Sequence, residues 1–357
     1  MVRAIQAMGS GAFLVQTCRY LAERPVEAWR AAEAAQPGRV VISPEGALSS
    51  GDPGERPIPR EAEERLALAR RLVADRCLYG VDKNPMAVEM AKLSLWLITL
   101  QKDRPFTFLD HALRRGDSQL GIDVAQLKTW NMRREGAGTP TSWHQAVETA
   151  LERALTLRRR IAQPEDLDIR VTEQKAALLR QAEEAMALVK LGGDLLVGSA
   201  LAGEAEDDGV MIDRLTRYTI ALSQAEEHER QPYTAEGLHQ SLVPAQELRA
   251  EAGRLLGLAA RPDRLPFHWP LEFPEVFLDQ AAPDATRGFD AIIGNPPFQG
   301  GQRITGAIGT DYRDYLVDCL ADGKRGSADL CAYFFLRGYG LSNHPGDLSL
   351  LATNTIA

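Results

Sequence analysis

Residues 289–298, Phe-Asp-Ala-Ile-Ile-Gly-Asn-Pro-Pro-Phe, constrain the fold more than any other stretch of the chain. They predict a short apolar strand that stops at Asn295, because two consecutive prolines cannot continue a ladder and Pro296 disfavours the α region for the residue before it. The strand end therefore presents an amide, two fixed carbonyls and the ring of Phe298 together. Such a set suits a planar substrate with an amino group. A buried strand with an ordinary Asn-Pro turn explains the tetrapeptide equally well.

Two earlier segments carry the pattern of a nucleotide-binding α/β unit. Residues 7–22 begin with Ala-Met-Gly-Ser-Gly-Ala-Phe-Leu and run into an amphipathic helix, whose first N–H groups point at the turn that the glycines allow. Residues 77–81 predict a buried strand, and Asp82 follows it where a carboxylate can accept hydrogen bonds from ribose hydroxyls. Each signal is weak alone, because Gly-x-Gly turns are common and an N-cap aspartate explains Asp82 nearly as well.

The next helix and turn extend the pattern. Asn84 and Pro85 begin a helix that runs to about residue 101, with proline at an early position that tolerates it. This helix is apolar nearly all round, so we expect it to be buried. Asp117 follows a glycine in a turn, for which an ordinary Asx turn is the simplest interpretation.

The middle of the chain changes character. Residues 36–60 are rich in Gly, Pro and Ser and predict an exposed loop. From about 141 to 260, Ala, Leu, Glu, Arg and Gln recur with helical spacing and strand signals are almost absent. This stretch predicts an insertion of several helices with solvated charged faces, interrupted at 192–193 and at 203–209. A final strand is expected at 348–352.

Composition excludes several classes of protein. The chain has 357 residues, four separated cysteines without a C-x-x-C pair and six scattered histidines, so no metal site is predicted and the thiols are expected to be reduced, as in the cytoplasm. The run at 93–100 is the most apolar and is too short for a membrane span, and no secretory signal is present. The formal net charge of −8 argues against a protein that grips DNA by itself, while a local basic groove is compatible with it.

Five segments in order resemble the N6-adenine DNA methyltransferases, most closely the large enzymes of restriction–modification and phage-defence systems of the type IIG, BREX and DISARM classes. The segments are Ala7–Leu14, Tyr79–Pro85, Gly116–Ser118, His268–Phe277 and Asn295–Phe298. Five ordered matches are far more specific than any one of them, and the resemblance covers roughly residues 4–30, 76–121 and 266–357.

The resemblance implies an α/β fold, a Rossmann-like S-adenosylmethionine-dependent methyltransferase sheet with a large α-helical insertion. Residues 1–126 would be the cofactor-binding half, with a loop insertion at about 31–60. Residues 127–265 would be the helical insertion, and residues 266–357 the catalytic half. In the family a target-recognition region lies further toward the C-terminus, and this sequence stops before one.

The resemblance also implies functional residues. The S-adenosylmethionine site of the family corresponds to Ala7, Met8, Gly9, Gly11, Phe13, Asp82, Lys83, Asp117 and Ser118. Among them Asp82 would hold the cofactor ribose and Asp117 would contact the cofactor adenine. The catalytic tetrapeptide corresponds to Asn295, Pro296, Pro297 and Phe298.

In the implied mechanism, the Asn295 side-chain oxygen and the Pro296 carbonyl accept the two N–H bonds of the adenine N6 amine. The amine becomes more pyramidal and its lone pair turns toward the methyl group, by placement rather than strong base catalysis. Phe298 stacks on the base, which must first be flipped out of double-stranded DNA. No metal is required. The expected partners are DNA and other subunits of a defence system, with no membrane association.

The N-terminus departs from the family pattern. Asp-Pro precedes Ala-Met-Gly-Ser-Gly in the family, and Ile5-Gln6 stands there in this chain. The missing aspartate helps hold the methionine part of the cofactor, and much of the first strand is expected to be absent. Together with the missing recognition region, this predicts a truncated copy, from a fragment, a frameshift or a mis-called start, with weakened cofactor binding and weak or absent activity.

Two other interpretations stay open at this point. Asn-Pro-Pro followed by an aromatic residue also serves methyltransferases that act on RNA or on a protein glutamine. Alternatively, the chain is a non-catalytic remnant that binds partners through its helices.

Overall fold

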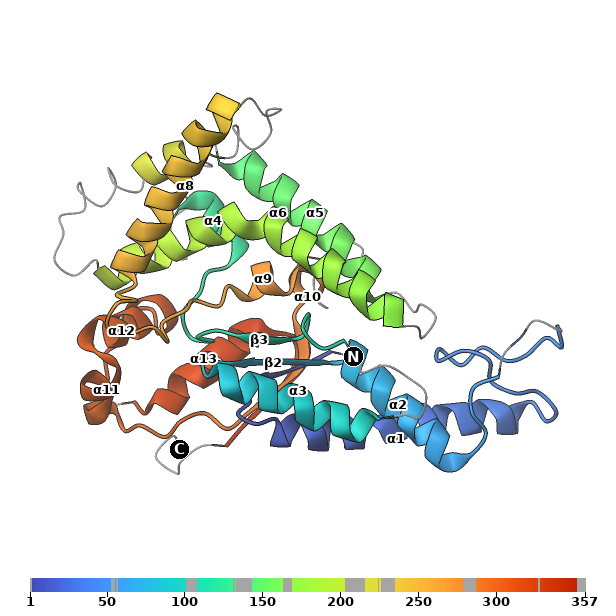
Figure 1. The fold of residues 1–357 in the computed structure, drawn as a ribbon. Coiled ribbons are helices and arrows are strands. Elements are labelled where there is room, and N and C mark those ends of the chain that lie inside the picture. Colours follow the sequence, from blue (N-terminus) through green and yellow to red (C-terminus); the bar gives the residue numbers. More distant parts are fainter. Residues whose placement is uncertain are drawn as a thin grey trace.

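The strands in the described part of the chain form one parallel sheet (Figure 1). The computed structural model describes residues 2–52, 55, 57–100, 108–130, 132, 143–162, 169–202, 216–223, 225, 235–278, 287–326 and 328–351. Within them the strand order is β3-β2-β1-β4-β5. The strands are β1 (Arg3–Gln6), β2 (Leu78–Asp82), β3 (Leu113–Arg115), β4 (Phe289–Gly294) and β5 (Ser342–Leu350). The expected Rossmann-like α/β sheet is thus confirmed, and its order reverses between β1 and β4, where open sheets of this kind bind ligands.

The first strand is short and central. Each of its four residues pairs with β2 on one side and with β4 on the other, and Ala4 and Ile5 are fully buried. Much of this strand was expected to be missing, yet Arg3–Gln6 suffices to join the two halves of the sheet.

Three helices cover one face of the sheet: α1 (Ala12–Ala35), α2 (Ala62–Arg76) and α3 (Pro85–Thr99) (Figure 1). They share a core with Ile5 and Leu78 of the strands. Gly11 begins α1 at φ 88°, and a Cβ there would lie 2.9 Å from the Cα of Ala91, so the approach of α1 to α3 requires glycine.

The loop before α2 is less exposed than predicted. Because α1 continues to Ala35, the loop begins at residue 36 rather than at about 31. Val41 is fully buried, Ile58 is buried as well, and the indole of Trp29 donates to the carbonyl of Pro44 at 2.9 Å. The Gly/Pro/Ser composition indicated the irregular backbone but not these anchoring side chains.

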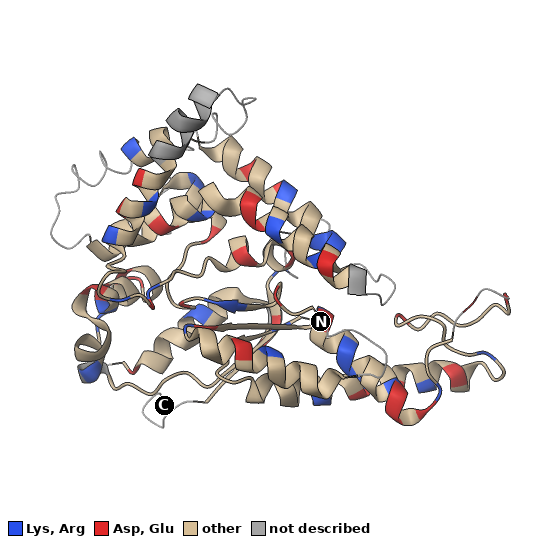
Figure 2. Ribbon diagram, viewed as in Figure 1, with Lys and Arg blue, Asp and Glu red and all other residues tan. Residues whose placement is uncertain are grey.

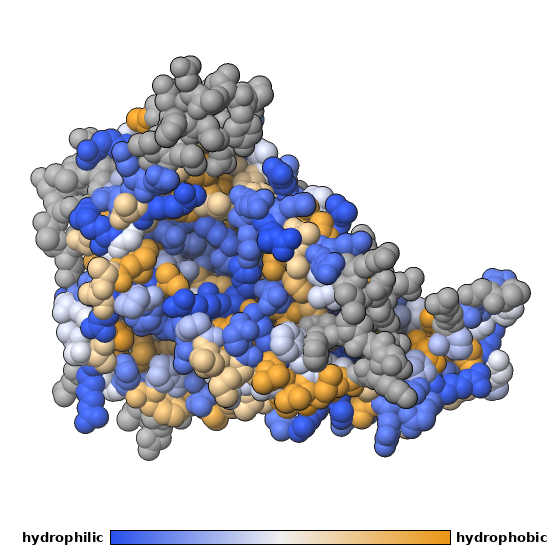
Figure 3. Space-filling model, viewed as in Figure 1, coloured by the Kyte–Doolittle hydropathy of each residue, from blue (hydrophilic) through white to orange (hydrophobic). Residues whose placement is uncertain are grey.

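Helix α3 was expected to be buried all round, and that expectation is wrong. Val88, Ala91 and Leu95 are buried against α1 and the sheet. The opposite side carries large apolar side chains that are 49–66% exposed: Met86, Met90, Leu93, Leu97 and, just beyond the helix, Leu100. Figure 3 shows apolar surface over this helix. Because α3 is apolar nearly all round, its sequence does not indicate which face of the helix packs against the rest of the protein.

The central region is helical, as expected. It contains α4 (Val124–Thr129), α5 (His144–Ala162), α6 (Ile169–Ala202) and α8 (Ala235–Leu255), stacked over the other face of the sheet (Figure 1). The expected break at 192–193 is wrong, because α6 runs through both glycines. A Cβ at Gly193 would lie 2.7 Å from Nε2 of His268, so this glycine allows close packing. The second expected break, at 203–209, lies outside the described residues.

Judged by length and composition alone, helix α6 could cross a membrane. It is a different segment from the run at 93–100, which the sequence analysis found to be the most apolar. However, 67% of its most apolar window is buried inside the structure, as in the core helix of a folded domain. Leu188, Leu195 and Val197 belong to the core that the insertion forms with α13.

The remaining elements surround β4. Two short helices, α9 (Trp269–Glu272) and α10 (Pro274–Phe277), lie between the sheet and the insertion (Figure 1). After β4 come α11 (Gly301–Ile308), α12 (Thr310–Tyr315), the π-helix η3 (Leu316–Leu320) and the aromatic helix α13 (Leu330–Leu341). The last strand begins at Ser342, earlier than the expected residue 348, and Thr353-Asn354 lie outside the described residues.

Candidate functional site

Strand register brings the segments singled out in the sequence to one edge of the sheet. Gln6 pairs with Val81 of β2 and with Gly294 of β4, and Asp82 pairs with Arg115 of β3. The residues that follow, Ala7 and Asn295 among them, therefore leave the sheet at the same level. Adjacent strands lie about 4.8 Å apart, so these groups surround the switch point, where a ligand crevice is expected in open sheets of this kind.

The glycine loop between β1 and α1 is held by backbone contacts. Ala7, Gly9 and Gly11 all have positive φ, which for Ala7 is a strained conformation of the kind found at functional sites. The N–H of Gly9 donates to Oδ2 of Asp82 at 2.9 Å, and that of Met8 donates to the carbonyl of Val81 at 3.2 Å. A Cβ at Gly9 would meet nothing within 4 Å, so the loop faces open space.

The side chains of Met8 and Phe13 serve the core. Met8 is 3% exposed, and its sulfur lies so close to Gly80 that a Cβ there would be only 2.4 Å away. Phe13 is partly buried against the same core. This arrangement leaves the backbone of the loop as the part that faces the crevice.

Asp82 is not the helix cap that the sequence left as an alternative. Asn84 is the N-cap of α3, because its side chain accepts from the N–H of Met86 at 3.0 Å. Asp82 instead accepts from the N–H groups of Gly9 and Asn84, at 2.9 and 2.8 Å. A carboxylate has about four acceptor positions, so Asp82 keeps capacity for the hydroxyls of a ligand.

Asp117 is the most deeply buried acid of the crevice, at 1% exposure. Its Oδ1 accepts from the N–H of Gln119 at 3.0 Å, which is the expected Asx turn. The Lys83 ammonium lies 3.1 Å from Oδ2, and the Tyr312 hydroxyl lies 2.9 and 2.8 Å from the two oxygens. The next residue, Ser118, is also buried, and its carbonyl accepts from the indole of Trp269 at 3.2 Å.

The tetrapeptide ends its strand as the two prolines predict, since β4 stops at Gly294. Asn295 and Pro297 are exposed, Pro296 is buried, and the ring of Phe298 is 52% exposed. The following residue, Gln299, accepts from the N–H of Leu330 at 3.0 Å, which ties the tetrapeptide to the start of α13. The amide of Asn295 and the ring of Phe298 are thus presented to solvent beside the glycine loop.

The two residues that depart from the family pattern face opposite sides of the sheet. Ile5 is in the core with α1 and α3. Gln6 is fully buried, and neither polar atom of its side chain has a hydrogen-bond partner among the described residues. Such a pair of unpaired polar atoms costs free energy, commonly about 1–3 kcal/mol each.

A connecting segment, residues 265–277, joins three parts of the site. The carbonyl of Leu265 accepts from the N–H of Asp117 at 2.6 Å, and the N–H of Phe267 donates to Leu120 at 2.7 Å. The ring of Trp269 lies 5.7 Å from that of Phe289 on β4. The segment therefore holds the turn of Asp117 against the strand of Asn295.

The same segment anchors the helical insertion through charges. Arg158 of α5, 4% exposed, forms two hydrogen bonds with Glu275 at 2.9 and 2.6 Å. Glu272 pairs with Arg114 of β3 at 3.0 Å and with Lys190 of α6 at 2.7 Å. Burial acts to raise the pKa of Glu272, but Lys190 and Arg114 outweigh it and lower that pKa to about 2.

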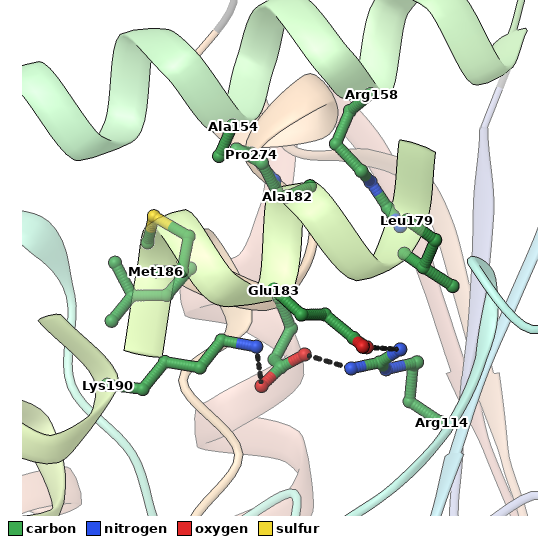
Figure 4. A pocket seen from close by; sticks show the side chains of 11 residues that line it. Arg114, Ala154, Arg158, Leu179, Ala182, Glu183, Met186, Lys190 and Pro274 are labelled. Atoms are coloured by element: carbon green, nitrogen blue, oxygen red, sulfur yellow. Dashed lines mark hydrogen bonds and ion pairs between the residues drawn. The ribbon is translucent and has the colours of Figure 1, made fainter. Parts of the chain in front are cut away.

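These pairs close the junction between insertion and sheet. Figure 4 shows Arg114 reaching toward Glu183 of α6, at 2.5 Å, with Lys190 of the same helix alongside. A cavity of about 10 Å³ lies among these pairs, and a wider pocket of about 510 Å³, which Arg114 and Glu183 also line, opens beside it toward α3. Elsewhere, basic and acidic residues are interspersed along the helices, as the colours of Figure 2 show. The insertion is thus held on the sheet by a partly buried ionic layer, in which the Arg158 side chain is 4% exposed and those of its partners are 12–39% exposed.

Sequence reasoning missed Tyr312, Asp263 and Arg264, which complete the surroundings of Asp117. Lys83 bridges Asp117 and Asp263, at 3.1 Å each. Arg264 pairs with Asp311, beside Tyr312. No local pattern connects these residues, because Tyr312 and Asp117 are 195 positions apart. Among the described residues, no group of three His, Cys, Asp or Glu side chains could hold a metal ion.

Comparison with known proteins gave one family. The model of the family described as Eco57I restriction-modification methylase matches residues 76–183 and 209–357. The match includes Asp82, Asp117 and the tetrapeptide, and does not extend over the glycine loop. No curated protein and no solved structure matches the chain.

Proposed function

The chain belongs to the Eco57I restriction-modification methylase family, and from this premise we propose that it transfers a methyl group from S-adenosylmethionine to the N6 amine of adenine in DNA. Membership implies a DNA methyltransferase of a restriction–modification system. The observation that carries the finer proposal is the register of β1, β2 and β4, which sets Asn295 beside the glycine loop and Asp82 at one sheet edge. Methyl transfer requires this adjacency, because donor and acceptor must meet in line.

The residues at the crevice fit S-adenosylmethionine. The open space before Gly9 admits a ligand against the loop backbone, and the spare acceptor capacity of Asp82 suits ribose hydroxyls. We assign Ala7, Gly9 and Gly11 to the cofactor through their backbone. Lys83, Asp117 and Ser118 belong to its adenine end in the proposal, and bound cofactor supplies the electrophilic methyl group.

The chemistry that this chain contributes is placement. The Asn295 carboxamide oxygen and the Pro296 carbonyl accept the two N–H bonds of the target amine, which turns its lone pair toward the crevice. Phe298, already half exposed, stacks on the flipped base. We place the reaction in the cytoplasm, on double-stranded DNA, with other subunits of a defence system as candidate partners.

The test is transfer of tritium from labelled S-adenosylmethionine to adenine-containing duplex DNA. We expect label in N6-methyladenine, and a loss of about 100–1,000-fold in Asn295→Ala, as for the removal of one preorganised hydrogen-bonding group. Asn295→Asp keeps an acceptor oxygen and is the matched variant that should retain more activity than the alanine.

Two results would contradict the proposal. Label that persists in Asn295→Ala would show that the tetrapeptide is not the catalytic site. Label in RNA or protein and none in DNA would assign the site to another substrate. Equilibrium dialysis with S-adenosylmethionine tests cofactor binding separately. Absence of binding would identify a non-catalytic remnant.

A further inference from the structure

The pocket on the outer side of the sheet has no part in the proposed function. It measures about 510 Å³, within the range of small-molecule sites, and is lined mainly by α3, α6 and β3. β3 is the last strand at this edge of the described sheet, with α3 and α6 on opposite sides of it (Figure 1). None of the described residues that line the pocket is among those that we assign to the cofactor or to the target base. The pocket is therefore a second candidate site.

Three carboxylates are among the described lining residues, and each is already paired with a cation. Lys92 of α3 lies 2.9 Å from Glu89 and 2.6 Å from Asp110. Arg114 pairs with Glu183 at 2.5 Å. Burial acts to lower the pKa of Lys92, but Asp110 and Glu89 outweigh it and raise that pKa, so the ammonium stays charged beside them. These carboxylates therefore oppose an anionic ligand only weakly.

Two guanidinium groups at the same pocket have no carboxylate partner among the described residues. Arg180 of α6 is exposed and, in that part of the chain, forms neither an ion pair nor a hydrogen bond. Arg115 donates from Nε to the carbonyl of Lys83 at 3.3 Å, which orients its side chain at the end of β3 and leaves both terminal nitrogens for a ligand. With four cations and three carboxylates, the described lining has a net charge of +1, in a chain whose formal net charge is −8.

The free charges and the size of the pocket indicate the class of ligand. A carboxylate carries one negative charge, whereas a phosphate monoester carries about −1.5 to −2 at neutral pH and has three acceptor oxygens, which suits two planar guanidinium groups. A phosphate fills only a small part of the cavity. The lining also includes Val88, Leu113 and Leu179, which are 2–7% exposed and form an apolar floor. This floor suits a planar body attached to the phosphate.

We propose that the pocket binds a nucleoside monophosphate, with its phosphate between Arg115 and Arg180 and its base on the apolar floor. The site is separate from the cofactor crevice, so the inference does not rest on the proposed function. Because Arg180 belongs to the insertion and Arg115 to the sheet, a ligand held by both would also stabilise the docked position of the insertion.

The test is a calorimetric titration of the full chain with thymidine 5′-monophosphate, in the presence of S-adenosylhomocysteine. A pyrimidine probe and an added cofactor product keep the cofactor crevice out of the measurement. We expect binding at one site. Thymidine and inorganic phosphate each lack one half of the ligand and should bind at least about tenfold more weakly. Equal affinity for thymidine would exclude the arginines, and equal affinity for inorganic phosphate would exclude the apolar floor; either result would overturn the proposal.

Two variants test the arginines directly. Arg115→Gln and Arg180→Gln should each weaken binding of the monophosphate by about tenfold, as for the loss of one charge-assisted hydrogen bond. Arg30→Gln is the matched control, because Arg30 is an exposed arginine of α1 that does not line the pocket, and its removal changes the net charge equally. Unchanged affinity in both pocket variants, or an equal loss in Arg30→Gln, would overturn the proposal.

A DNA strand is the other source of nucleotide phosphates, and a third titration separates it. The probe is decathymidine without terminal phosphates, whose phosphodiesters carry one charge each. Weaker binding of this oligonucleotide than of the monophosphate supports the proposal. Tighter binding that depends on Arg115 and Arg180 would assign the pocket to a DNA strand and overturn a site for a free nucleotide.

Discussion

Burial changes the pKa of single side chains in this protein, and His111 is the clearest example. His111 is 6% exposed, and its Nε2 lies 3.2 Å from the carbonyl of Asp75. Burial, reinforced by the Arg158 guanidinium, lowers the pKa of His111 from 6.5 to about 4. The carboxylates of Asp75 and Glu275 act to raise the pKa of His111, and the ammonium of Lys175 acts to lower it. The folded protein therefore keeps this imidazole neutral at a pH where the unfolded chain protonates it.

The first prediction concerns acid stability. Between pH 6.5 and about 4 the unfolded chain binds a proton at His111 and the folded chain does not, so stability falls as pH falls through this window. The loss is at most about 3 kcal/mol. Urea unfolding at a series of pH values should show it, and His111→Gln should flatten the slope there.

At the scale of elements, glycine positions decide how closely segments pack. Gly192 and Gly193 lie in succession in α6, and a helix gains up to about 1 kcal/mol from alanine in place of glycine. A Cβ at Gly192 would touch Leu127 and Leu222 at an ordinary 3.4 Å. At Gly193 it would lie 2.7 Å from the ring of His268, which is 2% exposed and held by Asp194 at 3.1 Å.

The second prediction compares these two glycines. Gly192→Ala should be neutral or stabilising by up to about 1 kcal/mol. Gly193→Ala should destabilise by about 1–3 kcal/mol, because His268 is held in place and cannot yield without losing its partners. Thermal unfolding of both variants checks the difference. Equal effects would mean that His268 moves freely and that the connecting segment does not fix α6.

Elements also show where sequence reasoning succeeds. The positions of β2, β4 and the start of α3 at Asn84-Pro85 could be predicted, because each depends on local signals such as a proline at an early helix position or a proline pair. The exposure of Leu93 and the continuity of α6 through Gly193 could not, because both depend on which segment packs opposite. Tyr312 beside Asp117 is a contact across 195 positions and has no local signal at all.

At the scale of the whole molecule, an ionic layer joins the insertion to the sheet. Arg158, Glu275, Arg114, Glu272 and Lys190 come from five separate elements. Buried pairs of this kind contribute little net stability, but breaking one leaves an uncompensated charge. They therefore specify the docked position of the insertion more than they add to overall stability.

The third prediction tests this layer. Glu275→Gln leaves the guanidinium of Arg158, 4% exposed, without its carboxylate, and we expect a loss of about 3–5 kcal/mol in urea unfolding. The control is Glu27→Gln, which breaks the exposed pair with Arg24 and should cost under about 1 kcal/mol. Similar small losses in both variants would show that water reaches the junction and that the insertion is not locked.

The four residues of β1 have a consequence for how the protein is made. A hydrogen bond next to this strand joins Val2 to Asp290, 288 positions later, and β1 cannot gain its second neighbour before β4 is synthesised. At ordinary translation rates that delay is roughly 15–60 s. During this time β1 can pair with β2, while its other edge lacks the partner strand that it has in the folded protein. The centre of the sheet is therefore completed only after the catalytic strand has emerged from the ribosome.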